Sequence, residues 1–515
     1  MRTSPRRESL SRARRGMILI MVVVVVAIMA LSAYGYTLLM TTENEATILS
    51  GHRIQARRLV DSGVEHVRVF LAQGEEIIKQ SDGIYDNPNM FELVPVRMDE
   101  DPRLQGYFSV VAPSILEGVQ TGTRYGLQDE SIRLNLNILT LADAYQENGG
   151  RTLLLALPDM TEEIADAIMD WIDEDDEARE YGCEFNDYYK GLNPTYTPKN
   201  GPLDSVEELL LVRGVTPALL FGADANHNGI IDLEEQQAAG AIEPELVLGW
   251  SNYLTLFSKE KNYNNAGQQR ININESNLEN LYNDLASTMR EEWASYIVAY
   301  RLYGPYTPAE DDETDGVITG DDLDLQGEGS FTFLQVLDMV DTFVKVDTGG
   351  DSVIVESPIK SASIGAQLPT LMDNLSIYDK GVITGRLNIN QCSKQLLLGI
   401  PGMTEEIADQ IVSVRDEVPD ETQIADINRQ WETWILAERI VTVDEMKSML
   451  PFITAKGHVY RAEVVGFFRE GSISSRASVV FDTTELFPRI LFWRNKSHLS
   501  LGYSKDFLLQ SEQQE

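Results

Sequence analysis

The chain has 515 residues, of which 43% are hydrophobic, and its formal net charge is −39. This length is enough for two or three domains, and the acidic balance disfavours contact with nucleic acid or anionic lipid headgroups while it favours divalent cations. The five histidines are scattered and no G-x-S-x-G, H-E-x-x-H or P-loop motif occurs, so we predict neither an enzyme nor a binder of small-molecule substrates.

The first predicted element is a helix that crosses a membrane. Six arginines and one glutamate lie in residues 1–16, and no further charged residue occurs before Glu43. This uncharged stretch exceeds the roughly 20 residues that a helix needs to span a bilayer, and the arginines favour a cytoplasmic amino end. Three interpretations are a secretory signal, an uncleaved anchor, and a leader cut on the cytoplasmic side between Gly16 and Met17. The third makes residues 1–16 a leader peptide and residues 17–41 the membrane-spanning half of a longer helix.

The same helix is predicted to continue to about Gln73. No proline interrupts it. Apolar residues recur on roughly one face at Ile48, Ile54, Leu59, Val60, Val64, Val67 and Leu71. A long amino-terminal helix of this kind is typical of pilins, and the alternative is a membrane anchor followed by an independent helical stalk. Pilin-like subunits usually carry a glutamate at the fifth position after cleavage, paired with the amino group of a neighbouring subunit, but this chain has Met21. Because a subunit at a filament tip has no neighbour ahead of it, Met21 favours a tip position.

Strands are predicted on both sides of a long middle segment. Residues 107–113 are rich in β-branched and aromatic side chains, and residues 458–482 alternate apolar and polar side chains around a turn at Glu470 and Gly471. We expect these strands to form one small antiparallel sheet against the long helix. Residues 42–130 then hold the rest of the helix and the first strands, and residues 451–515 hold the last strands and the tail. The predicted fold class is α+β, with a large, mostly helical insertion between about residues 131 and 450.

The insertion repeats one sequence pattern three times. The segments RLNLN, RININ and RLNIN begin at Arg133, Arg270 and Arg386, and each precedes a helix that opens with MTEEIADAI, MREEWASYI or MTEEIADQI. We predict three helical modules: residues 131–255, a degenerate copy with a connecting segment at residues 256–385, and residues 386–450. Thr161 and Thr404 are predicted to cap their helices, with glutamates in the positively polarised first turn.

Two of these modules resemble a helix-hairpin-helix motif of the SAM-like class. The segments concerned are LPDMTEEIADAI and IPGMTEEIADQI. Nucleic-acid-binding versions of this motif offer glycine-rich turns and basic flanks to phosphate, but here Met160 and Met403 replace the second glycine and the flanks are acidic. We therefore interpret these hairpins as packing units and predict no nucleic-acid partner.

The segment DANHNGIIDLEE has the spacing of an EF-hand calcium loop. The expected oxygen ligands are Asp224, Asn226, Asn228, the backbone carbonyl of Ile230, Asp232 and Glu235. Gly229 permits the sharp turn that such a loop needs. The alternative is an acidic surface turn. Because only one loop is complete and its flanking helices look short, we predict a calcium ion with a structural role rather than a sensor.

Two other acidic stretches are weaker candidates for calcium. In DDETDGVITGDD an aspartate stands where the loop needs a longer glutamate, and the candidates are Asp311, Glu313, Asp315 and Asp322. In DWIDEDDEAREYGCEFNDYY the candidates are Asp173, Asp175, Asp176 and Glu184, which lie near Arg179. The alternative for this second stretch is a solvated acidic turn with an internal ion pair.

The chain has two cysteines, Cys183 and Cys392. One disulfide between them in an oxidising compartment and two unrelated buried thiols are both compatible with this count. The sequence leaves that choice open.

Taken together, these features resemble minor pseudopilin K of type II secretion systems, also called general secretion pathway protein K. The resemblance rests on the Gly16–Met17 junction, Met21, DESIRLNLN, LLLALPDMTEEIADAIMDWIDEDDEAR, KNGPLDSVEELLLVRGVT and RILFWRN, and it is densest over residues 129–222. It implies a pilin-like scaffold interrupted by a large helical domain that binds calcium, with acidic ligands near Asp173 and Glu184. The EF-hand-like loop and the middle module at about residues 256–345 depart from the family pattern.

The same resemblance implies a location and partners. It implies cleavage and amino-methylation by prepilin peptidase, a single pass through the inner membrane, and a carboxy-terminal domain in the periplasm. The leader would be cytoplasmic before cleavage. The implied partners are minor pseudopilins I and J and the major pseudopilin, in a pseudopilus whose tip this subunit caps during export of folded proteins across the outer membrane. The alternatives are a type IV pilus-like tip for adhesion or DNA uptake, and a membrane-anchored hydrolase or adhesin stabilised by calcium.

Overall fold

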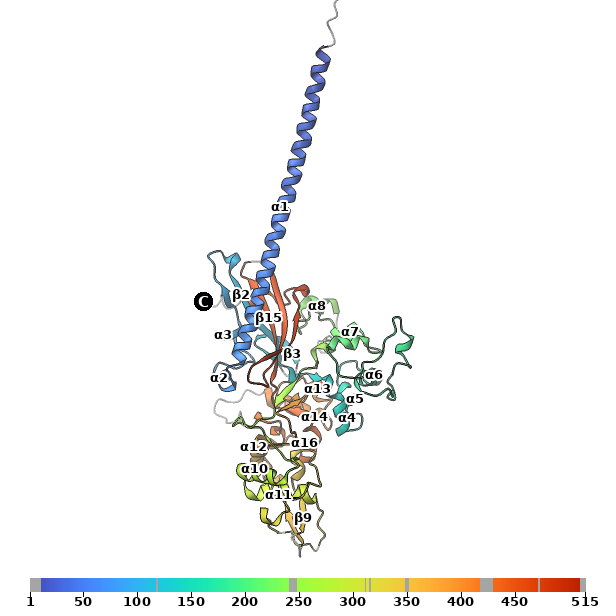
Figure 1. The fold of residues 1–515 in the computed structure, drawn as a ribbon, viewed down its shortest axis with the longest axis vertical. Helices are drawn as coiled ribbons and strands as arrows, with labels where there is room; N and C mark the ends of the chain where they lie inside the picture. Colours follow the sequence, from blue (N-terminus) through green and yellow to red (C-terminus); the bar gives the residue numbers. More distant parts are fainter. Residues whose placement is uncertain are drawn as a thin grey trace, which may run out of the picture.

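The computed structural model describes residues 11–116, 119–239, 248–310, 312–314, 316–347, 352–416, 429–470 and 473–509. Figure 1 shows one long helix, α1 (Ser11–Leu71), that extends from a sheet. Most helices of the inserted region lie beyond the other end of the sheet, and α8 (Leu233–Ala239) lies beside it. The combination of a long amino-terminal helix, an antiparallel sheet and a further set of helices confirms the predicted α+β class. The SAM-like character of the inserted modules stays a prediction.

Helix α1 has an exposed half and a packed half. All residues from Ile18 to Ser50 are exposed, and Ile18–Leu71 is long and apolar enough to cross a membrane. The buried residues follow at helical spacing: Ala56, Leu59, Val60, Val64, Val67, Phe70 and Leu71. The prediction that Ile48 and Ile54 belong to this packed face is wrong, because both side chains are exposed. The sheet ends near Phe468, which packs with Ala56 and Leu59 and leaves the preceding turns of the helix uncovered.

The sheet joins strands from the two ends of the chain. Its strands are β1 (Val94–Arg97), β2 (Gly106–Leu116), β3 (Val119–Tyr125), β4 (Gln128–Asp129), β15 (Val459–Phe468), β16 (Ser474–Asp482) and β17 (Arg489–Asn495). The main order is β1-β2-β15-β16-β17, all antiparallel, with β3 paired to β2 and β4 to β15. Val111 lies opposite Glu463, so the two predicted strand regions pair across the whole insertion. Short helices α2 (Glu75–Gln80), α3 (Pro88–Phe91) and α17 (Lys505–Leu508) accompany the sheet.

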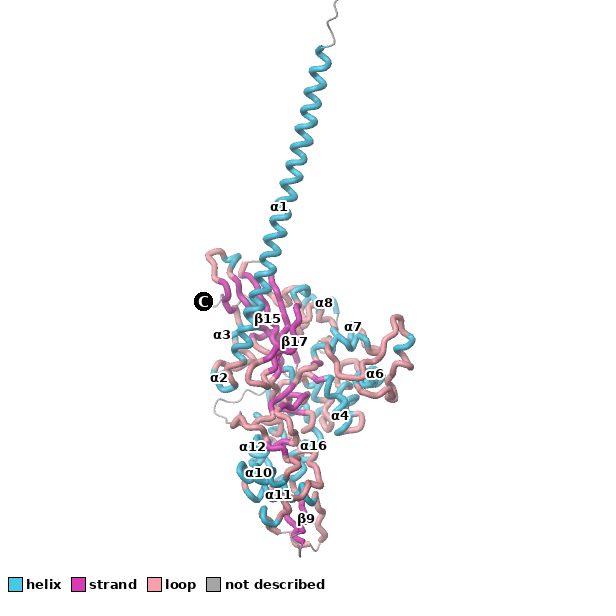
Figure 2. The backbone as a smooth tube through the Cα atoms, in the orientation of Figure 1, coloured by secondary structure: helices cyan, strands magenta, loops and turns pink. Residues whose placement is uncertain are grey.

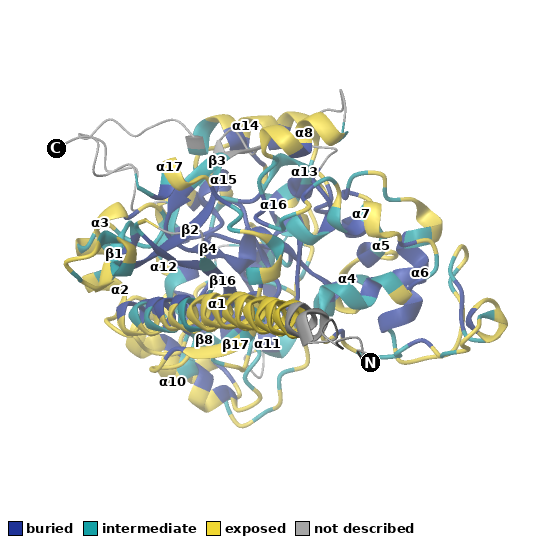
Figure 3. Ribbon diagram, turned by 90° about the horizontal axis from the view of Figure 1, so that it is seen from above, coloured by how far each residue is buried: buried dark blue, intermediate teal, exposed yellow. Residues whose placement is uncertain are grey.

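Two glycines allow α1 to approach the sheet closely. A Cβ on Gly466 of β15 would lie 2.7 Å from the backbone oxygen of Ala56 and 2.9 Å from the backbone nitrogen of Val60. A Cβ on Gly63 of α1 would lie 2.5 Å from Cγ1 of Val464. Both distances are shorter than side-chain packing permits, so the interface requires glycine at these positions. Figure 3, a view from above, shows the helix lying along one face of the buried strands.

The insertion contains more irregular structure than the predicted helical modules. Its helices are α4 (Leu139–Tyr145), α5 (Gly149–Leu154), α6 (Glu162–Ile172), α7 (Pro217–Phe221), α8 (Leu233–Ala239), α10 (Leu278–Thr288), α11 (Glu291–Tyr303), α12 (Ile364–Asn374), α13 (Lys394–Leu397), α14 (Glu405–Asp416), α15 (Trp434–Ala437) and α16 (Val443–Met449). Long loops connect them, as Figure 2 shows. Two small antiparallel ladders add β7 (Lys259–Lys261) with β12 (Val382–Thr384), and β9 (Phe343–Asp347) with β10 (Ser352–Glu356).

The three sequence repeats form the same local structure. Each begins a two-residue parallel ladder with a strand far along the chain: β5 (Leu134–Asn135) with β6 (Leu254–Thr255), β8 (Ile271–Asn272) with β11 (Leu375–Ser376), and β13 (Leu387–Asn388) with β14 (Ile453–Thr454). In each repeat the first asparagine accepts a hydrogen bond from the backbone N–H two residues later, at 2.9–3.0 Å; these residues are Asn135, Asn272 and Asn388. Such a turn favours asparagine, which explains why the repeat retains it.

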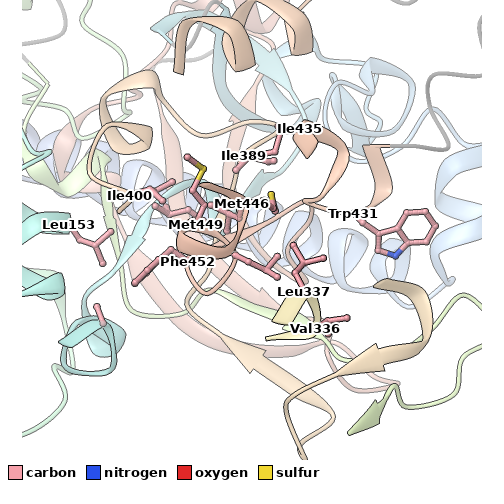
Figure 4. Packing of buried hydrophobic residues seen from close by; sticks show 14 of the residues in the cluster. Leu153, Val336, Leu337, Ile389, Ile400, Trp431, Ile435, Met446, Met449 and Phe452 are labelled. Carbon is pink, nitrogen blue, oxygen red and sulfur yellow. The ribbon is translucent and has the colours of Figure 1, made fainter. Parts of the chain in front are cut away.

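Threonine caps begin two of the repeated helices. The hydroxyl of Thr161 accepts from the N–H of Ile164 at 3.4 Å, and that of Thr404 accepts from the N–H of Ile407 at 3.2 Å. In the turns before these helices, Asp159 and Gly402 have φ values of 54° and 83°. One continuous hydrophobic cluster runs through all three repeats, and Figure 4 shows its centre with side chains from each of them. The described insertion therefore shares one core.

Cys183 and Cys392 are free thiols, and both are buried. Burial raises the pKa of both thiols, and that of Cys392 to about 11, so little reactive thiolate forms at neutral pH. We expect the native chain to resist a thiol-alkylating reagent and the denatured chain to take up two equivalents, as counted by intact mass. A denatured chain that takes up reagent only after reduction would contradict the free-thiol state.

Candidate functional site

The EF-hand-like segment forms a closed loop between α7 and α8, helices of five and seven residues. The carboxylate of Asp224 accepts from the N–H groups of Asn228 at 3.1 Å and Gly229 at 2.9 Å. Glu235, at the far end, accepts from Ala225 at 3.0 Å through Oε1 and from Asp232 at 3.1 Å through Oε2. The last ligand position therefore folds back over the first.

The remaining predicted ligands lie in the same loop. The side-chain oxygen of Asn226 accepts from the N–H of Asn228 at 2.9 Å, and that of Asn228 accepts from the N–H of Ile230 at 2.7 Å. Asp232 accepts from the side-chain amide of Asn226 at 3.2 Å and caps α8 through the N–H of Glu235 at 3.0 Å. Gly229 has φ 80°, the left-handed turn that the sixth position of such a loop needs.

The loop is held against the sheet by side chains from the carboxy-terminal strands. Lys496 donates to the backbone oxygen of His227 at 2.8 Å, and Arg476 donates to that of Asn226. The side-chain amide of Asn228 donates to the backbone oxygen of Gly502 at 2.5 Å. These contacts connect the insertion to the scaffold. Sequence reasoning missed them because the partners lie more than 240 residues apart, as the separations of 250, 269 and 274 positions show.

Burial makes the charges of this loop costly. Desolvation raises the pKa of Asp224 and Glu235 above their ordinary values, although the hydrogen bonds that each carboxylate accepts from backbone amides act in the opposite direction. Each carboxylate also has more lone pairs than the loop amides use. A hard cation with oxygen ligands would fit this donor set and would offset the charge.

Glu235→Ala is expected to abolish the calcium-dependent part of thermal stability. The substitution removes the carboxylate that closes the loop, so the rise in melting temperature on adding calcium to the full chain in detergent is expected to disappear. Differential scanning fluorimetry in calcium and in chelator measures this. Glu234→Ala, an exposed neighbour on α8, is the matched control and is expected to keep the full rise. An equal loss from Glu235→Ala in chelator and in calcium would contradict a metal role.

A second acidic cluster lies at the end of helix α6. Asp170 is on the helix, Asp173 is its C-cap, and Glu184 lies on the loop that follows. The guanidinium of Arg179 lies 3.6 Å from Asp170 and 3.6 Å from Asp173, and it donates to Asp143 at 2.8 Å. Arg179 thus forms ion pairs with three carboxylates, and among the described residues it forms none with Glu184.

Glu184 is the most poorly compensated acid of this cluster. Its side chain is 4% exposed, and neither carboxylate oxygen has a hydrogen-bond partner among the described residues; Oδ1 of Asp173 is in the same state. Burial, with repulsion from Asp170, Asp173 and Asp176, raises the pKa of Glu184 to about 7. Burial likewise raises the pKa of Asp170 and of Asp173 to about 6. Buried carboxylates without donors are the arrangement that a divalent cation would relieve.

The other two predicted ligands of this stretch, Asp175 and Asp176, are exposed and engaged in hydrogen bonds of their own. Asp175 accepts from the N–H of Glu177 and Asp176 from the amide of Asn200, both at 2.9 Å. Asp170, which the sequence analysis did not select, lies in the cluster instead. Its spacing of three residues from Asp173 and four from Asp166 on one helix is the signal that indicates a shared face.

The third acidic stretch is only partly described. Asp311 and Asp315 lie outside the described residues, whereas Glu313 and Asp322 are exposed. Asp322 accepts from the N–H of Thr319 at 2.8 Å and from its hydroxyl at 2.9 Å, a helix-capping role.

The two residues of the predicted cleavage site, Gly16 and Met17, lie within α1.

The spacing of the side chains supports a metal site less strongly than the types of oxygen donor in the loop do. Among the described residues, no three His, Cys, Asp or Glu side chains are gathered closely enough to hold a metal ion by themselves. Of the six predicted ligands of the EF-hand-like loop only three are of these types, Asp224, Asp232 and Glu235, and the other three are asparagine and backbone oxygens. Calcium therefore stays a prediction for both sites.

The comparisons with known proteins identify one domain. Residues 132–221 match the family model for the first domain of protein K of the type II secretion system (T2SS). A solved structure of the GspK-GspI-GspJ complex from the type 2 secretion system of enterotoxigenic Escherichia coli contains a chain that is 11% identical, with a TM-score of 0.36; the alignment covers 88% of this chain and 98% of that one. A search of curated proteins found no match. The chain therefore carries a domain of the type II secretion system protein K family, which confirms the resemblance found in the sequence.

Proposed function

We propose that this protein is a minor pseudopilin of a type II secretion system and that it takes part in the export of folded proteins across the outer membrane. The observation that carries the proposal is the position of the family domain: residues 132–221 follow β4 and precede β15, two paired strands of a sheet packed on a membrane-length helix. In this arrangement the long helix would anchor the subunit in the membrane, and the sheet would carry the inserted family domain outside it.

We place the subunit at the tip of the pseudopilus. Met21 supplies no carboxylate to pair with a neighbouring amino terminus inside the apolar bundle, so the subunit has no need of a neighbour ahead of it. Most helices of the insertion lie beyond the end of the scaffold farthest from the exposed half of α1, while α8 lies beside the sheet (Figure 1). Its bulk would therefore stand ahead of the filament, where it obstructs no stacking helix.

The proposed processing and partners follow from the same scaffold. Prepilin peptidase would cut between Gly16 and Met17 and methylate the new amino group, and the exposed half of α1 would stay in the inner membrane with the sheet in the periplasm. Minor pseudopilins of the I and J types and the major pseudopilin would pack against that helix. Its exposed surface from Ile18 to Met40 is entirely apolar or uncharged, as such a bundle requires.

Calcium would stabilise the insertion at two places. In the EF-hand-like loop, Asp224, Asp232 and Glu235 would supply carboxylates, Asn226 and Asn228 amide oxygens, and Ile230 a backbone oxygen. At the end of α6, Glu184 and Asp173 would supply the oxygens that have no donor among the described residues. The ion would bring two positive charges to carboxylates whose ionisation is otherwise opposed by burial.

The decisive experiment is amino-terminal mass spectrometry of the protein isolated from its native membrane. The expected mature chain starts at a methylated Met17. A chain that starts at Met1, or after Ala33, would contradict the proposal. Co-purification with pseudopilins of the same cell, with Gly16→Glu as the unprocessed control, tests assembly; recovery only with type IV pilins would favour the pilus alternative.

A further inference from the structure

The face of the scaffold sheet that points away from α1 carries charged side chains next to the insertion. Gly466 and Val464 of β15 contact helix α1, so the alternate residues Glu463 and Arg461 belong to the other face. In the antiparallel register Glu463 lies opposite Ser478 of β16, which lies opposite Arg494 of β17. The insertion covers this second face. Next to the insertion this second face therefore buries charged side chains, whereas Val465 and Phe467 of the same face are buried and apolar.

A polar cavity of about 90 Å³ lies between that face and the insertion. Strands of the sheet line it with Arg461, Glu463, Ser478, Arg494 and Lys496, and the insertion lines it with Arg133, Glu207, Asp224 and Asn252, beside Gln128 of β4. Since one water molecule needs about 10–15 Å³ of such space, the cavity has room for several waters or for one compact ion.

Positive charge exceeds negative charge around the cavity. The cations that line it are Arg133, Arg461, Arg494 and Lys496, and Arg476 lies next to them through its contact with Glu463. Arg461 pairs with Glu130 at 2.5 Å, Lys496 with Glu463 at 2.5 Å, and Arg494 with Glu207. Arg476 lies 4.0 Å from Glu463, which it must share with Lys496. Five cations thus have three carboxylate partners. Counting Asp224, which accepts from amides of its own loop, still leaves one positive charge in excess.

Arg133 is the cation of this group that forms no direct ion pair among the described residues, although Glu130 and Glu463 attract it at longer range. Its side chain is 6% exposed, and among the described residues no carboxylate lies within 4.0 Å of it. It donates to the side-chain oxygen of Gln128 at 2.5 Å, and its Nε has no acceptor. Burial and the nearby Arg461 lower its pKa to about 10, against the opposing attraction of Glu130 and Glu463.

Two neutral donors accompany Arg133 at the cavity. Nε2 of Gln128 and Nδ2 of Asn252 also have no hydrogen-bond partner among the described residues, and both residues line the cavity. Gln128 is buried and Asn252 is half-buried. The three unused donors of Arg133, Gln128 and Asn252 would be satisfied by a hydrogen-bond acceptor in the cavity. Because positive charge is in excess there, a negatively charged acceptor is favoured over a neutral one.

We propose that this cavity binds one small tetrahedral oxyanion of the sulfate or phosphate class, with Arg133 as its charged ligand and Gln128 and Asn252 as its neutral donors. The anion balances the excess charge that water would leave uncompensated. Because Arg133 and Asn252 belong to the insertion and the facing Arg461 and Lys496 to the scaffold, the bound anion joins the two parts. The cavity shares Asp224 and Asn228 with the EF-hand-like loop but is separate from the acidic cluster at α6, and the anion does not depend on the proposed secretion role.

The test is isothermal titration calorimetry of the full chain in detergent, with chelator present, using sodium sulfate and sodium phosphate against sodium chloride of equal ionic strength. We expect one saturable site at millimolar or lower anion concentration. Arg133→Gln is expected to weaken it at least tenfold, since a buried charged hydrogen bond is lost. Arg489→Gln removes an exposed cation of β17 that pairs with Glu485 and is expected to leave binding unchanged.

Asn252→Asp tests the same anion site independently, in case the Arg133→Gln chain fails to fold. Asn252→Asp places a carboxylate in the wall of the cavity, so it is expected to abolish anion binding and to raise the melting temperature in anion-free buffer. No saturable binding of either oxyanion to the wild-type chain would overturn the proposal and leave the cavity to water. Equal binding by wild type and the Asn252→Asp chain would also overturn it, because the anion would then sit elsewhere.

Discussion

Gly466→Val is expected to detach the packed half of helix α1 from the sheet and to destabilise the scaffold by about 2–3 kcal/mol. Valine would put atoms within 3 Å of the backbone of Ala56 and Val60, and backbone atoms of a helix give way less easily than side-chain ends. Thermal unfolding of the full chain in detergent measures the loss. Hydrogen exchange across residues 56–71 locates it, with faster exchange expected there than elsewhere.

Gly51→Ala is the matched control for this substitution. Gly51 lies in the same helix, but a Cβ there meets no atom within 4 Å. Because alanine favours a helix over glycine, this change is expected to stabilise the chain by about 0.5–1 kcal/mol. Unchanged exchange in residues 56–71 after Gly466→Val would show that the helix does not depend on close contact with β15.

Glu184→Gln is expected to stabilise the calcium-free protein at pH 8 by about 1–3 kcal/mol and to remove the stabilisation that calcium provides at this cluster. The pKa of Glu184 is about 7 in the folded chain, against an ordinary value of 4.5. The folded state thus holds the proton more tightly than the unfolded state. The contribution of this group is fully present below about pH 4.5 and is lost as the pH rises through 7. Glutamine keeps the shape of the side chain without its charge.

Melting curves between pH 5 and pH 8, in calcium and in chelator, measure both effects. The gain from calcium is expected to be largest at pH 8 and to shrink towards pH 5, because protons then compete for Glu184, Asp170 and Asp173. Glu174→Gln changes an exposed acid of the same stretch and is expected to alter neither curve. A calcium gain that survives Glu184→Gln undiminished would place the ion elsewhere.

Local sequence signals predicted the local structure well. The apolar spacing along α1 predicted the helix to within two residues of its carboxyl end, because Leu71 is the last helical residue. The threonine before EEIAD predicted the caps at Thr161 and Thr404, and the complete EF-hand spacing predicted a loop in which Asp224 and Glu235 lie close together. Each of these structures depends on residues within about a dozen positions of one another, so a pattern in the sequence is enough to indicate it.

Features that depend on distant residues were not predicted. Ile48 and Ile54 continue the apolar pattern of the packed face, yet the sheet does not extend far enough to cover them. The repeats were predicted as helical modules, but their asparagines instead begin parallel ladders whose second strands lie between 66 and 120 residues away, as the partners Asn388–Thr454 and Asn135–Thr255 show. Arg476 and Lys496 meet the EF-hand-like loop only because the sheet brings the carboxyl end of the chain to the insertion.

The pairing of β2 with β15 sets the order in which the protein becomes complete. Because Val111 pairs with Glu463, β2 can join β15 only after the whole insertion has been synthesised. Until then the face of α1 from Ala56 to Phe70 lacks the part of its cover that Val464 and Gly466 of β15 provide. A chain that ends within the insertion therefore cannot complete the scaffold sheet.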